Sequence, residues 1–227
     1  MLTSVATSVW QHPSSVRLLP GAHLPLHMTI IRLDDGSLLL HSPTAIDDAL
    51  AQELERLGPV NHLVAPNLLH HLHVAAAQRR YPQATLYAPD ALPAKNAQVR
   101  LDVPLSRAAE RLTPDLGCFP LRGAPQLDEW VFHHFPSHTL IVTDLVFHIH
   151  QPQGWLTPWV LRAAGTYRRL AVSRLVKRLV VDRRAFLQSL APILDLDCQR
   201  LLMAHGDGVE QEAMALLRTA VQERFPD

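Results

Sequence analysis

The sequence is poor in cysteine and contains no long apolar run. Two cysteines, Cys118 and Cys198, occur among 227 residues and form no CxxC pair, so the composition indicates neither a disulfide framework nor a cysteine-based zinc site. No apolar run approaches the roughly 18 residues that span a bilayer, and the first residues lack the cationic head and apolar stretch of a secretory signal. We therefore expect a cytoplasmic protein without a membrane span.

An excess of charge of one sign is also missing, as are several well-known motifs. The 21 Lys and Arg residues balance 21 Asp and Glu residues, which argues against a nucleic-acid partner. The chain has no GxxxxGK[ST], strand-linked GxGxxG, HExxH or GxSxG motif, so nucleotide kinases, Rossmann dehydrogenases, zincins and standard serine hydrolases are disfavoured. With 48% hydrophobic residues, residues 1–227 have the composition of one globular domain.

The first half of the chain alternates strands and helices. Two β-rich runs flank an Asp-Gly turn and predict a hairpin over residues 27–43. Apolar residues at helical spacing predict a helix over 44–58, with Thr44 as its cap and Gly58 as its stop. The next predicted elements are a strand at 61–66, a helix at 67–81 and a strand at 84–89.

The second half contains another hairpin and a basic helical segment. Two β-rich runs surround Pro136-Ser137 and predict the hairpin. Residues from about 158 to 194 look helical and carry eight Lys and Arg residues against one acid. A strand at 200–205 and a helix from about 209 to 224 follow. This order indicates an α/β layered domain with mixed sheets, in which about 158–194 is a basic helical insert.

Histidine is abundant, with 14 residues, and several histidines follow predicted strands. His70, His71 and His73 come just after one strand, Asp144 lies near the end of another, and His205 closes a third. Residues beyond the carboxyl ends of strands converge in α/β folds despite large sequence separation. Imidazole and carboxylate are ligands of catalytic zinc and iron. The alternative is that these side chains only cap strands and bond loop carbonyls.

Four short segments occur in order along the chain: His41-Ser42-Pro43, Val64–Asn67 followed by His70-His71, Thr139–Leu145 and Ala204–Gly206. They resemble the corresponding segments of the metallo-β-lactamase superfamily, and more closely those of an uncharacterised bacterial family within it, domain of unknown function 4336. The resemblance covers most of the chain. It implies a single-domain αββα sandwich with mixed sheets and a metal-dependent hydrolytic activity.

The resemblance also implies a set of metal ligands. The Asp-His pair that closes the superfamily motif HxHxDH falls on His70-His71, the bridging aspartate on Asp144 and the last ligand on His205. The first two histidines of the motif fall on residues without ligand atoms, Pro66 and Leu68. The resemblance therefore implies one divalent metal, zinc or iron, bound by His71, Asp144 and His205, with His70 as a fourth ligand or a catalytic proton carrier. The further candidates to orient ligands or substrate are Asn67, Ser42, His73 and His134.

These observations lead to two hypotheses. The first is a metal-dependent hydrolase with a mononuclear site that acts on a small molecule. The second is a non-catalytic binding or interaction module of the same fold that has lost its metal. If the basic segment 158–194 covers the cleft, an anionic substrate is expected; otherwise the segment is the solvated side of helices whose apolar residues face the core.

Overall fold

Two β-sheets stack against each other. The computed structural model describes residues 1–107 and 115–226. The first sheet has the order β1-β2-β3-β4-β5-β6-β7, with β1 (Thr3–Ala6), β2 (Val9–Leu19), β3 (Ala22–Arg32), β4 (Leu38–His41), β5 (Val60–Val64), β6 (Thr85–Ala88) and β7 (Val103–Pro104). The second has the order β11-β10-β9-β8, with β8 (Leu116–Pro120), β9 (Trp130–His134), β10 (Thr139–Val142) and β11 (Arg200–Met203). Both sheets are mixed, as predicted.

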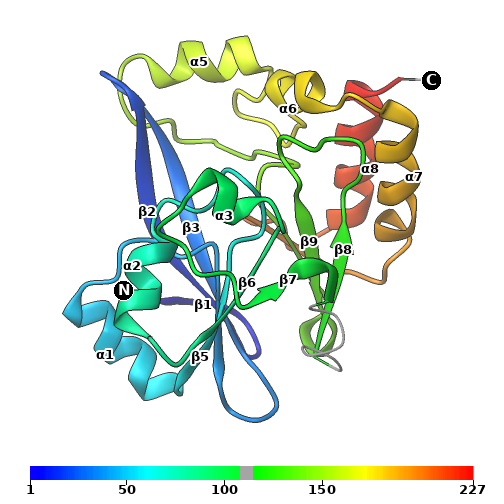
Figure 1. The fold of residues 1–227 in the computed structure, drawn as a ribbon. Helices are drawn as coiled ribbons and strands as arrows, with labels where there is room; N and C mark the ends of the chain where they lie inside the picture. Colours follow the sequence, from blue (N-terminus) through cyan, green and yellow to red (C-terminus); the bar gives the residue numbers. More distant parts are fainter. Residues whose placement is uncertain (108–114, 227) are drawn as a thin grey trace.

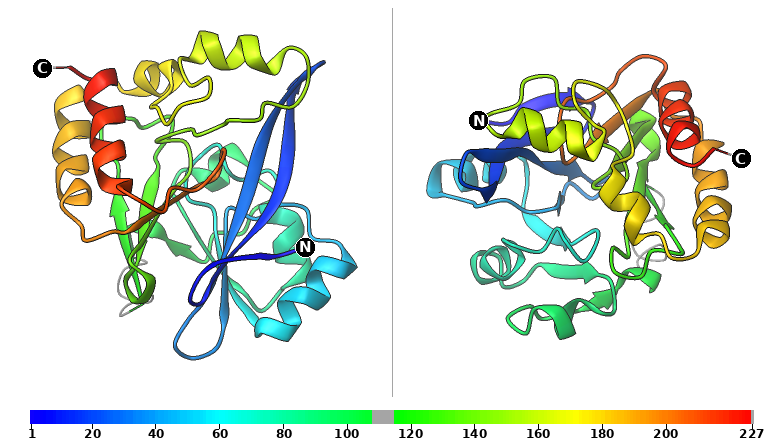
Figure 2. Two further views of the ribbon diagram at one scale, coloured as in Figure 1. Left: turned by 180° about the vertical axis from the view of Figure 1, so that it is seen from behind. Right: turned by 90° about the horizontal axis from the view of Figure 1, so that it is seen from above.

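Helices cover the outer faces of both sheets (Figures 1 and 2). The apolar faces of α1 (Asp48–Leu57) and α2 (Val74–Arg80) pack on the first sheet, and those of α7 (Arg183–Leu194) and α8 (Ala213–Arg224) pack on the second. The remaining helices among the described residues are α3 (Leu92–Lys95), α5 (Thr157–Ala164), α6 (Arg174–Leu179) and two short 3₁₀ turns, Leu105–Arg107 and Phe135–Ser137. The predicted αββα sandwich is confirmed.

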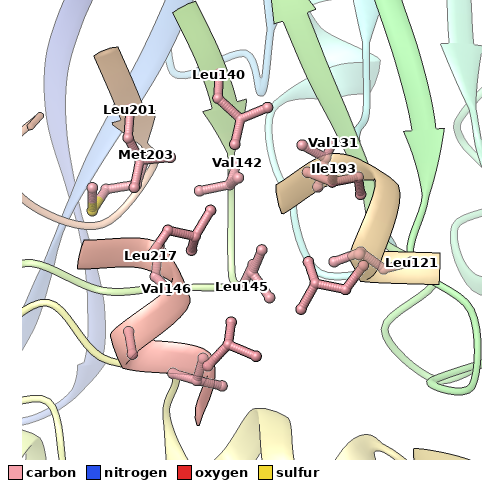
Figure 3. Close-up of a cluster of buried hydrophobic side chains, with 14 of the residues drawn as sticks. Leu121, Val131, Leu140, Val142, Leu145, Val146, Ile193, Leu201, Met203 and Leu217 are labelled. Atoms are coloured by element: carbon pink, nitrogen blue, oxygen red, sulfur yellow. The ribbon is translucent and has the colours of Figure 1, made fainter. Parts of the chain in front are cut away.

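Alternation along the strands assigns each side chain to a layer. On β4, Leu38 and Leu40 join the cluster under α1 and α2, whereas Leu39 joins the cluster between the sheets. On β10, Leu140 lies under α7 and α8 (Figure 3), while Ile141 faces the other sheet. Because successive strand side chains point to opposite faces, these short strands, buried on both faces, contribute to two cores at once.

Both predicted hairpins are present. β3 pairs antiparallel with β4 across the Asp-Gly turn, and β9 pairs antiparallel with β10. The long β2–β3 ribbon and β8 were not predicted. The ribbon contains Pro13 and Pro25 within its strands, and proline lacks the N–H of a ladder hydrogen bond, which weakens the sequence signal for a strand.

The predicted helix at 67–81 is shorter than expected. Its helical part, α2, begins at Val74, because the side chain of Asn67 accepts hydrogen bonds from the backbone N–H groups of Leu69 and His70 and holds these residues in a turn. The helix predicted at 44–58 begins at Asp48 with Asp47, not Thr44, as its cap, and it ends at Gly58 as predicted.

The basic segment forms three separate helices, α5, α6 and α7. Gly165 ends α5 in a left-handed conformation, and the side chains of Ser173 and Asp182 cap the starts of α6 and α7. In the part of the chain that the structure describes, no helix combines the length and the apolar character needed to cross a membrane.

Candidate metal site

Three chain segments that are distant in sequence meet at one edge of the sandwich. β10 and β11 run parallel with Val142 opposite Met203, so Asp144 and His205, two residues further along each strand, emerge side by side. In the other sheet β4 runs parallel to β5 with His41 opposite Val64. The loop after β5 carries His70 to the same edge, because parallel strands end at a common edge of a sheet.

His70, Asp144 and His205 form a buried triad. The Nε2 atom of His70 lies 3.3 Å from Oδ2 of Asp144, and Nε2 of His205 lies 3.4 Å from Oδ1 of Asp144. The two Nε2 atoms are 3.2 Å apart. One ligand atom from each residue therefore lies within 4.8 Å of the others. Two imidazoles and one carboxylate thus face a common point.

The other ring nitrogen of each histidine is held by a partner. Nδ1 of His205 donates to the carbonyl oxygen of Pro25 at 2.8 Å, which leaves the lone pair of the neutral ring on Nε2. Nδ1 of His70 hydrogen-bonds with the hydroxyl of Ser42 at 2.7 Å, and Ser42 itself is buried with a left-handed φ of 55°. The ring of Phe147 stacks on His205 at 4.9 Å. Both imidazoles are therefore oriented toward Asp144.

Asp144 is anchored through its side chain and its backbone. The amide Nδ2 of Asn67 donates to Oδ2 of Asp144 at 2.7 Å and to Oγ1 of Thr143 at 3.0 Å. The carboxylate of Glu129, which is completely buried, accepts from the N–H of Thr143 at 2.8 Å and from that of Asp144 at 3.1 Å. Asn67 also binds the loop of His70, so this one amide couples the two ligand segments.

Electrostatics place negative charge at the centre of the triad. Burial by itself raises the pKa of Asp144, but the charge of His70 and the hydrogen bonds of both histidines outweigh it and hold this pKa well below its usual range. Burial lowers the pKa of His205, yet the hydrogen bond and charge of Asp144 reverse the effect and raise it. Burial, followed by the charge of Asp144, raises the pKa of Glu129 to about 7.

The sequence-predicted residues fall into two groups. The structure brings Asp144, His205, Asn67 and Ser42 together, and with them His70. The others lie outside the triad. His71 and His73 line the pocket onto which the triad opens, and Nδ1 of His71 lies 3.3 Å from the side-chain amide of Asn96. His134 hydrogen-bonds with the hydroxyl of Ser137.

Adjacent residues on an irregular loop point in different directions, which explains the separation of His70 from His71. His134 lies opposite Thr139, the first residue of β10, whereas Asp144 follows the last residue of that strand. His134 and its neighbour His133 are both buried.

Three groups at the site were not identified from the sequence: Glu129, the carbonyl of Pro25 and Phe147. None of them belongs to a ligand-like pattern in the sequence. Each contributes only through a contact with a distant residue, so no local signal could have revealed it.

The donor set fits a divalent cation. Two imidazoles and one carboxylate whose ligand atoms face a common point form a donor set suited to zinc, and two histidines with one carboxylate are also a known set for ferrous iron. The hydrogen bonds of both Nδ1 atoms match the outer partners that metal-binding histidines use. The positions that correspond to the first two histidines of HxHxDH hold Pro66 and Leu68, both buried, and Leu68 packs in the core beneath α1 and α2.

A pocket opens onto the triad. Its volume is about 450 Å³, and its lining includes His70, Asp144 and His205 together with many aliphatic side chains. Volumes of 300–1,000 Å³ are typical of small-molecule sites. The triad is therefore reachable by a small molecule.

Comparison with solved structures identifies the fold. The chain is similar to a metallo-β-lactamase from Pontibacter korlensis, with TM-score 0.64, 14% identity and 98% of each chain covered. It is similar to the metallo-β-lactamase DIM-1, with TM-score 0.70, 12% identity and 98% and 96% coverage. It is also similar to FIM-1 from Pseudomonas aeruginosa in its mono-zinc form, with TM-score 0.64, 19% identity and 100% and 96% coverage. The chain thus has the metallo-β-lactamase fold.

Residues 8–107 match the model of a family described as Domain of unknown function (DUF4336). The predicted resemblance to this family is confirmed over these residues, and the resemblance to the metallo-β-lactamases is confirmed at the level of the fold. The matched segment includes Ser42, Asn67 and His70, while Asp144 and His205 lie beyond it. No curated protein matches the chain in sequence.

Proposed function

We propose that this protein is a metal-dependent hydrolase with a single divalent ion held by His70, Asp144 and His205. The observation that carries the proposal is the convergence of these three buried side chains, with their ligand atoms within 4.8 Å. His70 takes the ligand position that the sequence assigned to His71. Among residues 1–107 and 115–226, no second group of three His, Cys, Asp or Glu side chains meets the same distance, which supports a mononuclear site. The metal is zinc or iron.

The residues around the triad have two roles: some orient the proposed metal ligands, and one exchanges a proton with the substrate. A divalent ion in such a site supplies Lewis acidity, which polarises a substrate oxygen and acidifies water. Asn67 fixes the carboxylate of Asp144, and Glu129 fixes its backbone N–H. Ser42 and Pro25 fix the two imidazoles. His71, at the pocket wall, is placed to exchange a proton with the substrate, since imidazole titrates near neutral pH.

Metal content tests the proposal directly. Protein purified without a histidine tag should contain one zinc or iron ion per chain by elemental analysis. His70→Ala, Asp144→Asn and His205→Ala should each retain less than about one tenth of this metal, because each removes one of only three protein ligands. Hydrolysis of esters, lactones or phosphoesters should disappear on chelation.

His71→Ala is the matched control, because His71 neighbours His70 in the sequence but lies outside the triad. It should keep the metal. Loss of metal in His71→Ala with retention in His70→Ala would restore the assignment made from the sequence. Retention in all four variants would remove the proposed site, and wild-type protein that binds no metal would favour the non-catalytic module.

A further inference from the structure

The pocket above the triad combines a polar floor with apolar walls. His70, Asp144 and His205 form the floor. Most of the remaining lining is aliphatic and comes from three places: the β2–β3 ribbon, helix α5 and the loop before α2. Representative side chains are Val16, Leu24, Leu26, Val160, Leu161 and Leu69.

The apolar lining continues to the mouth of the pocket. Leu72, in the loop before α2, is 66% exposed, and Leu175, on α6, is 57% exposed, although both line the pocket. Exposed leucines of this kind lose contact with water when an apolar ligand arm lies against them. The mouth of the pocket therefore favours an apolar ligand, as its walls do.

Charged side chains do not supply an anion site here. Among the described residues that line the pocket, Asp144 is the one acid, and there is no lysine or arginine. Arginines of the segment 158–194 make contacts elsewhere: Arg162 lies over the ring of Tyr167 at 3.8 Å, and Arg174 donates to the carbonyl of Ala163. An anionic arm that lies against the aliphatic walls would lose its hydration without gaining a lysine or arginine as a partner.

We propose that the substrate carries an uncharged apolar arm, an acyl or aryl group, which fills this pocket while its scissile polar group lies at the triad. The inference rests on the proposed function and names its substrate class as neutral esters or lactones with such an arm. Hydrolysis adds one water: the acyl C–O bond breaks, the oxygen of water bonds to the acyl carbon, and a proton of water leaves with the alcohol. No oxidant or reductant is required.

Binding to metal-free protein tests the pocket independently of the metal. The neutral fluorophore N-phenyl-1-naphthylamine should bind saturably, and 1-alkanols should displace it with affinity that rises about two- to four-fold per methylene. Short dianions such as phosphate and glutarate should not displace it. Absence of saturable binding, or displacement by the dianions and not by the alkanols, would overturn the inference, and the second result would favour an anionic substrate.

Two exposed positions provide variants that can fold normally. Leu72→Glu and Leu175→Glu should each weaken fluorophore binding about tenfold, because each places a charge on the apolar lining. Val181→Glu is the matched control, since Val181 is 71% exposed and does not line the pocket, and its binding should not change. An equal loss of fluorophore binding in all three variants would contradict the assignment of the fluorophore to this pocket.

Turnover separates this inference from the proposed function. With metal-loaded protein, kcat/KM for p-nitrophenyl esters should rise with acyl length from acetate to octanoate, and Leu175→Glu should flatten the rise. If the fluorophore and the metal bind but no ester, lactone or phosphoester is hydrolysed, the hydrolase is refuted while the apolar pocket stands. If short and long esters are hydrolysed equally, the hydrolase stands and the apolar arm is refuted.

Discussion

At the scale of single residues, the side chain of each proposed ligand in the triad is hydrogen-bonded by a group outside the triad. His70 has the hydroxyl of Ser42 at its Nδ1, His205 has the carbonyl of Pro25, and Asp144 has the amide of Asn67. Such outer contacts fix the tautomer and the direction of a ligand, and losing one lowers metal affinity by about 10- to 100-fold.

Ser42→Ala isolates one of these contacts. It removes the hydrogen bond to His70 and leaves all three ligands in place, so metal affinity measured by competition with a chromophoric chelator should fall about 10- to 100-fold. Ser37→Ala is a suitable control, because Ser37 is also buried but bonds Asp35 instead. Both variants should lose about 1 kcal/mol of stability. Equal metal affinity in the two would show that Ser42 does not orient His70.

At the scale of elements, the turns that follow the strands determine where the ligands lie. The turn after β11 is tightly packed: Gly206 has φ +116°, and a Cβ atom built on it would lie 2.1 Å from the carbonyl oxygen of His148. Next to this contact, the backbone N–H of His148 donates a hydrogen bond to the carbonyl oxygen of His205. The position of His205 therefore depends on a glycine beside it.

Gly206→Ala should destabilise the protein and weaken metal binding together, since relief of the clash must displace the turn that carries His205. Gly36→Ala is the control, because Gly36 also has a positive φ, but its nearest new contact is an arginine side-chain atom at 3.9 Å. In urea denaturation, Gly206→Ala should lose about 1–3 kcal/mol more than Gly36→Ala. Equal losses would mean that backbone conformation alone sets the cost.

At the scale of the whole molecule, the triad joins the two halves of the sandwich. His70 follows a strand of the seven-stranded sheet, whereas Asp144 and His205 follow strands of the four-stranded sheet. The unfolded chain holds these ligands far apart, so a metal that binds the triad binds the native state selectively and stabilises it.

Metal should therefore raise the melting temperature. Zinc or ferrous iron at about 100 times its dissociation constant stabilises the native state by about 2.7 kcal/mol, which corresponds to a rise of about 5–10 °C for a domain of this size. Differential scanning calorimetry of chelator-treated protein, with and without metal, measures this shift. Asp144→Asn should show no comparable rise. A rise of the same size in that variant would place the stabilising ion outside the triad.

The elements predicted best were those with local signals. The Asp-Gly turn of the β3–β4 hairpin, the end of α1 at Gly58 and the strand before His205 all follow from short segments. The start of α2 and the β2–β3 ribbon could not be predicted from short segments. The side chain of Asn67 holds the loop before α2 in a turn, and prolines within the ribbon weaken its strand signal. Local propensity is weak where a side-chain contact or a partner strand determines the conformation.

The αββα sandwich was implied by the resemblance to a known family. The residue pattern by itself determined an α/β layered domain with mixed sheets, the order of its hairpins, and the fact that histidine and aspartate follow strands. These properties depend on periodicity and turn chemistry over short windows. Only the tertiary structure placed His70 rather than His71 against Asp144 and gave the pocket its aliphatic walls. Both results depend on residues more than 70 positions apart, such as Asn67 and Asp144, whose meeting is decided by the packing of two sheets and not by any local pattern.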